Sequence, residues 1–249
     1  NLTNSLRFRS SASAYLNRTP TVTSNTTTWT FSAWVKRGTL NSSGTAYLIS
    51  AGTSSNQVQV YFTNDSLQME YYNTTGPVNN YITSSAVYRD PSAWYHIVAI
   101  WDTTQGTSSN RMKLYVNGNQ ITSFSASSYP TQNLAGAANN SAYANYLGKA
   151  TASAGYFDGY MTDINFIDGQ ALEPYYFGNN DANGVWKPIQ YKGTYGTNGF
   201  YLTFGNTTST TTLGYDSSPN GNNWTCNNIS LTAGTTYDAM LDVPTNTSA

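Results

Sequence analysis

Three regularly spaced aspartates are the clearest candidates for chemistry in this chain. Asp158, Asp163 and Asp168 occur five positions apart in the stretch FDGYMTDINFIDG (157–169). Two carboxyl groups can act as acid and base in glycoside hydrolysis, and carboxylates together with amides can bind Ca²⁺. Aspartate followed by glycine is also a common turn signal, so the same residues could end a β-strand. The spacing therefore has to be judged against the element that carries it.

A strand between the outer two aspartates keeps them apart. If residues 159–167 are extended, a rise of about 3.3 Å per residue separates Asp158 from Asp168 by roughly 30 Å. The two carboxyl groups of a glycosidase lie only about 5–9.5 Å apart. We therefore expect Asp158 and Asp168 to form turns, with Asp163 inside a strand from Tyr160 to Ile167. Alternation predicts one face with Tyr160, Thr162, Ile164 and Phe166 and the other with Met161, Asp163, Asn165 and Ile167.

The other residue types used in catalysis are scarce. Glu70 and Glu173 are the only glutamates, and neither has an acidic residue two positions away, as a carboxyl pair on one strand would need. His96 is the only histidine and lies within a strand pattern, while Cys226 is the only cysteine, so an intrachain disulfide is excluded. No phosphate-binding loop and no paired-histidine motif occurs. We predict that the chain is not an enzyme and that His96 is structural.

The composition is polar but weakly charged. Of 249 residues, 9% are charged and 21 are tyrosines, the net charge is −1, and Asn, Ser and Thr make up more than a third. Such a chain offers no electrostatic attraction to nucleic acid or an anionic membrane, and no apolar run approaches the roughly 20 residues of a membrane span. We therefore expect no nucleic-acid partner and no membrane insertion. Low surface charge protects little against self-association, which suits a subunit that contacts copies of itself.

Alternating apolar and polar residues predict many β-strands. The pattern recurs with turn residues between the runs, and WYHIVAIWD (94–102) is apolar on both faces, as a strand covered on both sides should be. Asn117-Gly118 within 113–124 indicates a hairpin with a type I′ turn. No stretch has a convincing helical period. The sequence therefore predicts an all-β fold, an antiparallel two-sheet sandwich of the jelly-roll type.

Several stretches resemble the laminin-G-like and concanavalin-A-like lectin sandwiches. The resemblance covers about residues 5–175 and is carried, in order, by SLRFRSSASAYL, TWTFSAWVKR, WYHIVAIWD, KLYVNGNQI, YLGK and FDGYMTDINFIDGQAL. It implies a lectin-like, concanavalin-A-like domain over residues 1–175. The region from FIDGQALEPYYFG (166–178) to NGNNWT (220–225) is similar to a region of tail-fibre and other virion proteins of bacteriophages, especially marine ones. That likeness implies a module carried on a virion.

Residues 176–249 hold one segment out of its usual place. The stretch 216–225, which ends in SPNGNNWT, resembles the segment that normally precedes the first strand of such domains, yet here it lies near the C-terminal end. Too few residues follow Thr225 for another sandwich, which takes about 100 residues. We expect residues 176–249 to be an extension that folds back to complete or cap the first sandwich. The alternative is the start of a second unit.

Two tyrosine- and asparagine-rich stretches are the candidate binding loops. They are EYYNTTGPVNNY (70–81) and AGYFDGY (154–160). Tyrosine supplies a rigid amphipathic face that can stack on a sugar, while asparagine and threonine can reach its hydroxyls. The alternative is that these tyrosines only cover sheet surfaces or contact other subunits. The candidate ligand-binding residues, expected within reach of solvent, are Tyr72, Asn73, Asn80, Tyr81 and Tyr156.

Calcium is a further possibility that the resemblance implies. Laminin-G-like domains and related lectins bind Ca²⁺ at a loop edge through aspartate, asparagine and backbone oxygens, and the ion takes 6–8 oxygen ligands. The weak candidates are Asp102, at a strand end, and Asp163 or Asn165. The competing interpretation of Asp102 is a turn residue bonded to its own backbone. We otherwise expect no cofactor.

Three functions are compatible with these observations. The first is a non-enzymatic virion or fibre protein, located on the virion or outside the cell, whose lectin-like domain contacts a glycan on the host surface. Its partners would be copies of itself or other virion proteins. The second is a purely architectural, self-assembling subunit of a capsid surface or extracellular structure, without a ligand. The third is a secreted carbohydrate-binding module or glycosidase-like enzyme. We favour the first.

Overall fold

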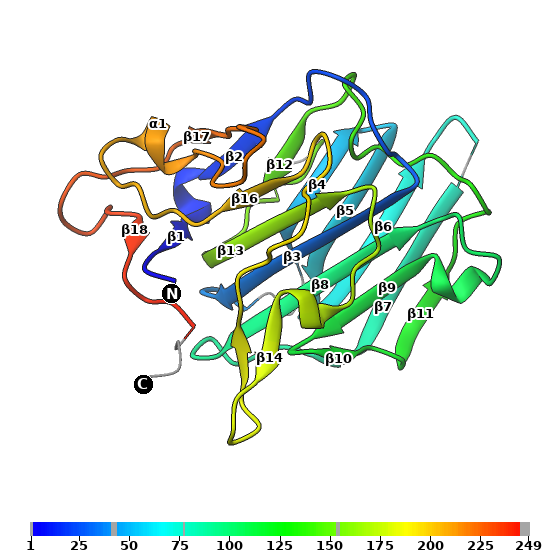
Figure 1. Cartoon of the computed structure of the whole chain (residues 1–249), viewed down its shortest axis with the longest axis horizontal. Coiled ribbons are helices and arrows are strands. Elements are labelled where there is room, and N and C mark those ends of the chain that lie inside the picture. The colour runs from blue at the N-terminus through cyan, green and yellow to red at the C-terminus, as the bar shows by residue number, and fades with distance from the viewer. Residues whose placement is uncertain (1, 41–43, 77, 153–154, 245–249) are drawn as a thin grey trace.

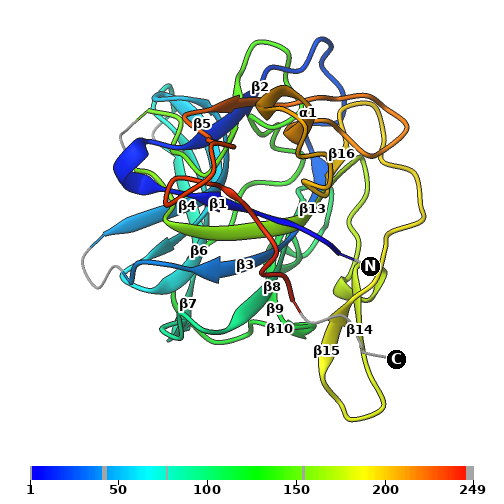
Figure 2. The same ribbon diagram turned by 90° about the vertical axis from the view of Figure 1, so that its left-hand side faces the viewer.

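Two antiparallel β-sheets pack face to face in this chain (Figures 1 and 2). The computed structural model describes residues 2–40, 44–76, 78–152 and 155–244. Each large sheet has eight strands, and a two-stranded ribbon lies outside them. The predicted all-β sandwich of the jelly-roll type is confirmed. None of the helices in these ranges is long and apolar enough to span a membrane.

The first sheet, called sheet A, contains strands from near both ends of the chain. In spatial order they are β10 (Asn119–Gln120), β9 (Met112–Val116), β8 (Trp94–Asp102), β3 (Thr28–Arg37), β13 (Gly159–Asp168), β1 (Ser5–Phe8) and β18 (Ala239–Met240), with β16 (Phe200–Leu202) also paired to β13. Sheet B consists of β11 (Phe124–Ser128), β7 (Val78–Val87), β6 (Ser66–Asn73), β5 (Asn56–Thr63), β4 (Thr45–Thr53), β12 (Asn145–Leu147), β2 (Tyr15–Arg18) and β17 (Thr225–Asn227).

The remaining elements are short. They are the ribbon of β14 (Gly178–Asn180) and β15 (Trp186–Pro188), the helix α1 (Thr210–Leu213), and the 3₁₀ turns η1 (Ser10–Ala12), η2 (Ser108–Asn110) and η3 (Pro174–Tyr176). The ribbon lies on the side of sheet A that faces away from sheet B (Figure 2). Between β9 and β10, Asn117 and Gly118 both have positive φ, 49° and 80°, as the predicted type I′ turn requires.

A row of aromatic rings crosses the core side of sheet A. Trp101 on β8 stacks on Trp29 of β3 with ring centres 6.3 Å apart, and Trp29 lies 5.5 Å from Phe166 of β13. Phe166 stacks on Phe200 of β16 at 5.6 Å, and Phe200 meets Trp224 at 4.8 Å. All five side chains are buried in the main hydrophobic cluster. Burying a large apolar side chain contributes roughly 1.5–3 kcal/mol, so the row holds two late parts of the chain in the common core.

The chain after residue 175 pairs with both sheets. β16 and β18 extend sheet A beside β13 and β1, and β17 pairs with β2 at the edge of sheet B. Just before β18, Asp238 accepts bonds from the guanidinium groups of Arg7 and Arg9 at 3.1 and 2.7 Å. The early and late parts of the chain therefore share sheet edges. The domain boundary at residue 175 stays a prediction.

The outer two aspartates flank β13 as predicted. Asp158 precedes the strand and accepts bonds from the Ser10 amide at 3.1 Å and the Thr39 hydroxyl at 2.5 Å. Asp168 ends the strand and accepts bonds from the Ser24 hydroxyl at 2.6 Å and the Asn139 amide at 2.9 Å. Both carboxylates are used to hold loops together at opposite ends of one strand.

A β-bulge in β13 overturns the predicted faces of its first half. Pairing with β3 passes from Thr162 opposite Trp34 to Asn165 opposite Ser32, so residues 163 and 164 oppose a single residue. Asp163 has a φ of 51°, a left-handed conformation that aspartate tolerates better than most residues. Met161 and Ile164 consequently both lie in the core. The prediction that Thr162 and Ile164 share a face is wrong, because strict alternation fails at a bulge.

Candidate ligand-binding cleft

One edge of β13 is shared by two strands that leave a gap between them. β1 pairs with Gly159–Met161, and β16 pairs with Ile164–Phe166. Asp163 lies between these two stretches, at the bulge. Beside it, the Thr162 hydroxyl donates to the backbone oxygen of Asn4 at 2.7 Å, which fixes the approach to β1. The bulge thus places Asp163 at the point on the edge of β13 between the part paired with β1 and the part paired with β16.

The carboxyl group of Asp163 is buried and only partly satisfied. The residue is 1% exposed, and its Oδ2 atom has no hydrogen-bond partner among the described residues. Burial raises the pKa of Asp163 to about 7, although interactions with the side chains of Tyr201 and Asn165 act in the opposite direction. Burial and the nearby charge of Asp163 raise the pKa of the Tyr201 phenol, which therefore keeps its proton. An acceptor oxygen is thus available for a donor that this part of the chain does not supply.

Residues 170–195 cover this side of sheet A. Thr30 on β3 holds the start of the segment, since its hydroxyl donates to the Gln170 carbonyl at 2.8 Å and accepts from the Leu172 amide at 2.9 Å. Further along, the Tyr195 hydroxyl donates to Asn165 Oδ1 at 3.1 Å. The segment and the sheet form a second hydrophobic cluster, made of Val98, Ile100, Tyr115, Ile167, Phe177, Tyr191, Tyr195 and Tyr201.

The ribbon β14–β15 is held to sheet A by a buried histidine. Trp186 Nε1 donates to His96 Nδ1 at 3.0 Å, so that nitrogen carries no proton, and His96 Nε2 lies 2.9 Å from the Ser32 hydroxyl. Burial lowers the pKa of His96 to about 3, and the ring is neutral near pH 7. The Trp186 ring also lies so close to Gly118 and Gly178 that a Cβ atom at either position would come within 2.6 Å of it. Both ring nitrogens of His96 are therefore engaged in contacts within the fold.

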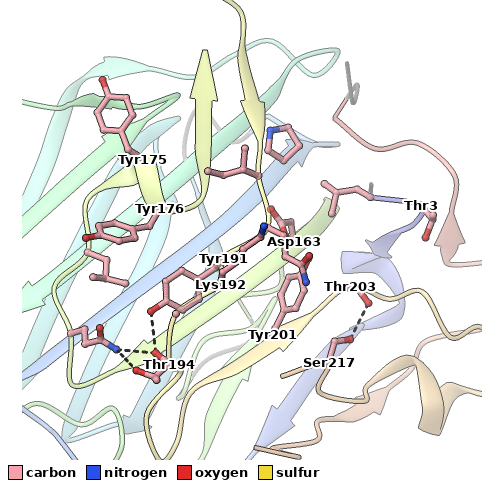
Figure 3. Close-up of a pocket in the computed structure, with 17 residues that line it drawn as sticks. Thr3, Asp163, Tyr175, Tyr176, Tyr191, Lys192, Thr194, Tyr201, Thr203 and Ser217 are labelled. Carbon is pink, nitrogen blue, oxygen red and sulfur yellow. Dashed lines mark hydrogen bonds between the residues drawn. The ribbon is translucent and has the colours of Figure 1, made fainter. Parts of the chain in front are cut away.

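Between the covering segment and the gap lies a cleft of about 1210 Å³. Asp163 and Tyr201 line its floor, and Tyr191 and Lys192 form part of its wall (Figure 3). At its mouth Tyr175 and Tyr176 are 64% and 53% exposed. The full lining is Leu2, Thr3, Asp163, Gln170, Leu172, Tyr175, Tyr176, Pro188, Ile189, Gln190, Tyr191, Lys192, Gly193, Thr194, Tyr201, Thr203 and Ser217. A concave site lined by aromatic rings and a few polar groups is typical of small-ligand binding.

The residues predicted to bind a ligand do not line the cleft, and Tyr72 and Tyr81 lie on the outer face of sheet B. Tyr72 on β6 and Tyr81 on β7 are half-buried, and register places Gln57 and Glu70 opposite them. Tyr156 packs 6.2 Å from Tyr15 on β2. Five strand spacings separate β7 from β2, which is about 24 Å. The structure therefore does not bring Tyr156 together with the other candidates.

The two predicted asparagines are occupied by local contacts. Asn80 is buried, and its amide donates to the Ser128 hydroxyl and the Tyr129 carbonyl at 3.3 and 3.0 Å. The expectation that Asn80 is within reach of solvent is wrong, because it lies on the core side of β7. Asn73 is half-buried, donates to the Tyr71 hydroxyl at 3.0 Å and accepts from the Thr75 amide at 2.8 Å.

The weak calcium candidates do not form one cluster of acidic residues. Asp102 accepts bonds from Thr104 and Gln105, at 2.6 Å from each side chain, and from the Thr28 hydroxyl at 3.3 Å. Asp163 and Asn165 lie at the bulge on another strand. Within the described ranges, no group of three or more His, Cys, Asp and Glu side chains is placed to hold a metal ion. Calcium binding stays a prediction.

A family model described as the concanavalin A-like lectin/glucanases superfamily (Laminin_G_3) matches residues 10–174. The chain belongs to this family. A search of curated proteins finds no match. The match ends at residue 174, so most of the cleft lining, from Tyr175 onward, lies outside the part that the family model describes.

The solved structures that resemble this chain have low sequence identity to it. The heptameric SAP-like pentraxin from Limulus polyphemus is 20% identical, covers 64% of this chain and 71% of its own, and has a TM-score of 0.43. The CBM40 of the Ruminococcus gnavus IT-sialidase is 17% identical, with 60% and 79% covered and a TM-score of 0.43. Domains LG4–5 of the mouse laminin α1 chain are 11% identical, with 76% and 44% covered and a TM-score of 0.47. The family assignment rests on the sequence match rather than on these likenesses.

Sequence reasoning missed the tyrosines of the cleft. Tyr175, Tyr176 and Tyr191 come from stretches that alternation does not assign to regular strands, EPYYFG and IQYKGTYG, whereas Tyr201 lies in a predicted strand, FYLTF (200–204). The available signal was the density of tyrosine between residues 175 and 201 in a region poor in charge. What brings these rings together is the path of residues 170–195 across sheet A, which no local pattern encodes.

Proposed function

We propose that the chain is a carbohydrate-binding protein whose ligand lies in the cleft, and that it binds without catalysing a reaction. The observation that carries this proposal is the cleft itself, with two exposed tyrosines at its mouth and a buried carboxyl group at its floor. Membership of the concanavalin A-like lectin/glucanases superfamily supports binding of a carbohydrate or similar ligand. The cleft is a place where such a ligand can bind, and most of its lining comes from residues after 174, outside the part that the family model matches.

The lining residues match the chemistry of a sugar. Tyr175 and Tyr176 present rigid rings on which the C–H faces of a pyranose can stack. Gln170 and Gln190 carry amides, and Thr203 and Ser217 carry hydroxyls, that can exchange hydrogen bonds with sugar hydroxyl groups. Such a mixture of aromatic faces and neutral polar groups favours a hydroxyl-rich ligand over a purely apolar one.

A binding role is favoured over hydrolysis by the count of carboxyl groups in the cleft. Of the described residues that line it, Asp163 alone carries a carboxyl group. Glycosidases of either stereochemistry require two, about 5–9.5 Å apart. The enzyme alternative predicts turnover of laminarin- or agar-type polysaccharides that disappears in the Glu70→Gln or Asp163→Asn variant. Release of reducing ends by the unaltered protein would contradict the binding proposal.

A virion or fibre is the setting that we propose for this binding, with a host-surface glycan as the ligand. The similarity of the region from FIDGQALEPYYFG to NGNNWT to virion proteins supports it, and low surface charge suits packing among copies of the chain or other virion proteins. Antibody labelling of purified phage particles in electron microscopy tests the location. Particles without label, or label confined to cell lysate, would contradict it.

The test of binding is a glycan array followed by calorimetry with three tyrosine variants. We expect Tyr176→Ala and Tyr175→Ala each to weaken binding of the array's best glycan by about tenfold, the loss of roughly 1.4 kcal/mol of stacking. Tyr215→Ala is the matched control, because Tyr215 is 46% exposed but does not line the cleft. Equal affinities for all three variants would place the binding site elsewhere.

The outer face of sheet B is the second candidate surface. Its half-buried Tyr72 and Tyr81 and its neutral amides would suit either a glycan or a second copy of the chain. Light scattering distinguishes the architectural alternative, which requires assembly without added ligand. A glycan that binds the Tyr175→Ala and Tyr176→Ala variants normally but not the Tyr72→Ala variant would favour this face.

A further inference from the structure

Asp163 combines a left-handed backbone, a buried side chain and an unsatisfied oxygen atom. Its backbone is in the left-handed region, its side chain is 1% exposed, and Oδ2 lacks a partner among the described residues. Leaving a buried charged acceptor unsatisfied is costly, and backbone strain of this kind persists where the surroundings enforce it. Asp163 nevertheless lines the cleft rather than the core (Figure 3). The carboxyl group therefore lies directly beneath the surface of the cleft, with its Oδ2 atom buried.

The lysine and arginine side chains around the cleft do not satisfy this carboxyl group. Lys192 is the one lysine or arginine among the described lining residues, and it is exposed. None of the ion pairs within the described ranges involves Lys192 or Asp163. The hydrogen bond that Tyr195 donates goes to Asn165 instead, at 3.1 Å. The side chains of Tyr201 and Asn165 interact with the carboxyl group, and Oδ2 is its oxygen without a hydrogen-bond partner among the described residues, so we expect Oδ2 to take a donor from a ligand.

The surroundings of the carboxyl group favour a positively charged donor. The side chain of Tyr201 interacts with the carboxyl group of Asp163, and Tyr195 stacks on Tyr201 with ring centres 6.3 Å apart. Aromatic faces attract cations, and opposite charges interact more strongly in a poorly solvated site than in water. A sugar hydroxyl could donate one hydrogen bond but would leave the charge uncompensated. A quaternary ammonium would compensate the charge but has no N–H group to donate.

We propose that the cleft binds a sugar that carries a protonated primary amine, and that this ammonium group donates to Oδ2 of Asp163. The inference rests on the proposed carbohydrate-binding function and names the class of sugar, an amino sugar with a free amine. The tyrosines at the mouth then contact the sugar ring, while Asp163 recognises the amine. No bond is made or broken, and the ligand is released unchanged.

The test compares matched oligosaccharides by calorimetry on the full chain. Glucosamine tetramer and N-acetylglucosamine tetramer differ in the charge and donor capacity of the nitrogen but share the same sugar ring and linkage. At pH 7 we expect the unaltered protein to bind the free-amine tetramer at least about tenfold more tightly, as loss of one charge-assisted hydrogen bond would imply. Equal affinity for the two tetramers would overturn the inference.

Asp163→Asn tests the role of the carboxyl group with little change in shape. Asparagine tolerates positive φ as aspartate does, so the bulge is expected to persist, which circular dichroism and the urea midpoint verify. In this variant the preference for the free amine should disappear, while Tyr215→Ala keeps it. A preference retained in Asp163→Asn would overturn the inference.

If Asp163→Asn fails to fold, acidification of the unaltered protein from pH 7 to 5.5 provides the same test. Protonation of Asp163 should then weaken binding of the free-amine tetramer severalfold and leave that of the acetylated tetramer unchanged. Equal weakening of both tetramers would overturn the inference.

Two further outcomes separate this inference from the proposed function. If a neutral glycan binds and depends on Tyr176, the carbohydrate function stands and only the amine is wrong. If lysine amide, an amine without a sugar, binds as tightly as the glucosamine tetramer, the sugar contributes nothing and the amino-sugar assignment falls. Absence of binding by every glycan and tetramer would overturn both proposals.

Discussion

The outer faces of the two sheets differ in what covers them. On sheet A, residues 170–195 lie over the strands and bury His96 and Asn165 beneath a second hydrophobic cluster. On sheet B, Tyr72 and Tyr81 stay half-buried, and the described residues form no comparable cluster there. The sequence indicates part of this difference, because β8 on sheet A is apolar on both faces whereas outward residues of β6 on sheet B, such as Gln68 and Glu70, are polar. Where an outward side chain of sheet A is polar, as His96 is, a later segment of the chain decides whether it meets solvent.

Removing one aromatic side chain from each face is the strongest test of that difference. Phe177 is fully buried in the cluster on sheet A and packs on Tyr191 at 5.3 Å, so Phe177→Ala should lower the free energy of unfolding by about 3–5 kcal/mol. Tyr72→Ala on sheet B should cost less than about 1 kcal/mol. Urea denaturation measures both. Equal losses would mean that the two faces are equally covered.

The pH dependence of stability should differ between the buried groups of sheet A. His96 has a folded pKa of about 3 against 6.5 when unfolded, so its contribution to stability is lost as pH falls from 6.5 toward 3. Asp163 has a folded pKa of about 7 against 3.8, so its contribution is lost as pH rises from 3.8 to 7. Between pH 4 and 6.5 the two effects oppose each other.

Asp163→Asn removes one of these opposing effects. In the variant the free energy of unfolding should rise with pH between 4.5 and 6.5 more steeply than in the unaltered protein, by about 1.4 kcal/mol per pH unit. Urea unfolding at several pH values measures this slope, and comparison with the unaltered protein cancels the contributions of all other groups. Parallel pH profiles would show that Asp163 titrates as a solvated carboxyl group does.

A smaller effect is expected when the covering ribbon loses a single hydrogen bond. Trp186→Phe keeps an aromatic ring over His96 but removes the N–H group that donates to His96 Nδ1. Leaving that buried acceptor without a partner should cost about 1–3 kcal/mol. The urea midpoint gives the size of the loss. A loss below about 0.5 kcal/mol would mean that the ribbon does not depend on this bond.

The smallest effect is expected from calcium. Both oxygens of Asp102 already accept hydrogen bonds, so we expect millimolar Ca²⁺ to leave the Tm unchanged within about 1 °C. A site filled at 100 times its Kd would instead add about 2.7 kcal/mol, a rise of several degrees for a chain of this size. Thermal unfolding with Ca²⁺ and with EDTA distinguishes the two, and a rise that Asp102→Asn abolishes would identify Asp102 as a ligand.

Local patterns in the sequence predicted those features that depend on neighbouring residues. The alternation of β-strands, the turn at Asn117-Gly118 and the roles of Asp158 and Asp168 at the ends of β13 all follow from residues within one strand or turn. The burial of His96 agrees with the apolar pattern of the strand around it. The contacts that determine these elements join residues close together in the sequence, so the local pattern is enough to predict them.

Features that depend on distant segments were not predicted. The bulge at Asp163 arises where β1 and β16 share an edge of β13, and these strands lie far from it on either side in the sequence. Asn80 was expected at the surface but points to the core, where Ser128 and Tyr129 bind it. The cleft is formed by residues 170–217 crossing a sheet whose strands came earlier. Neither the alternation of apolar and polar residues nor the composition indicates where a later segment of the chain packs across an earlier sheet.

The pairing of β1 with β18 has a consequence for how the chain folds. Leu6 lies opposite Ala239, and Leu16 on β2 lies opposite Cys226 on β17. At about 5–20 residues per second, a ribosome takes roughly 10–50 s to make the chain between Leu6 and Ala239. Although β13 and β12 can pair with β1 and β2 earlier, one edge of each of these two strands stays bare during that time and can join other nascent chains. We therefore expect slow refolding, limited by contacts between the two ends, with yields that fall as protein concentration rises.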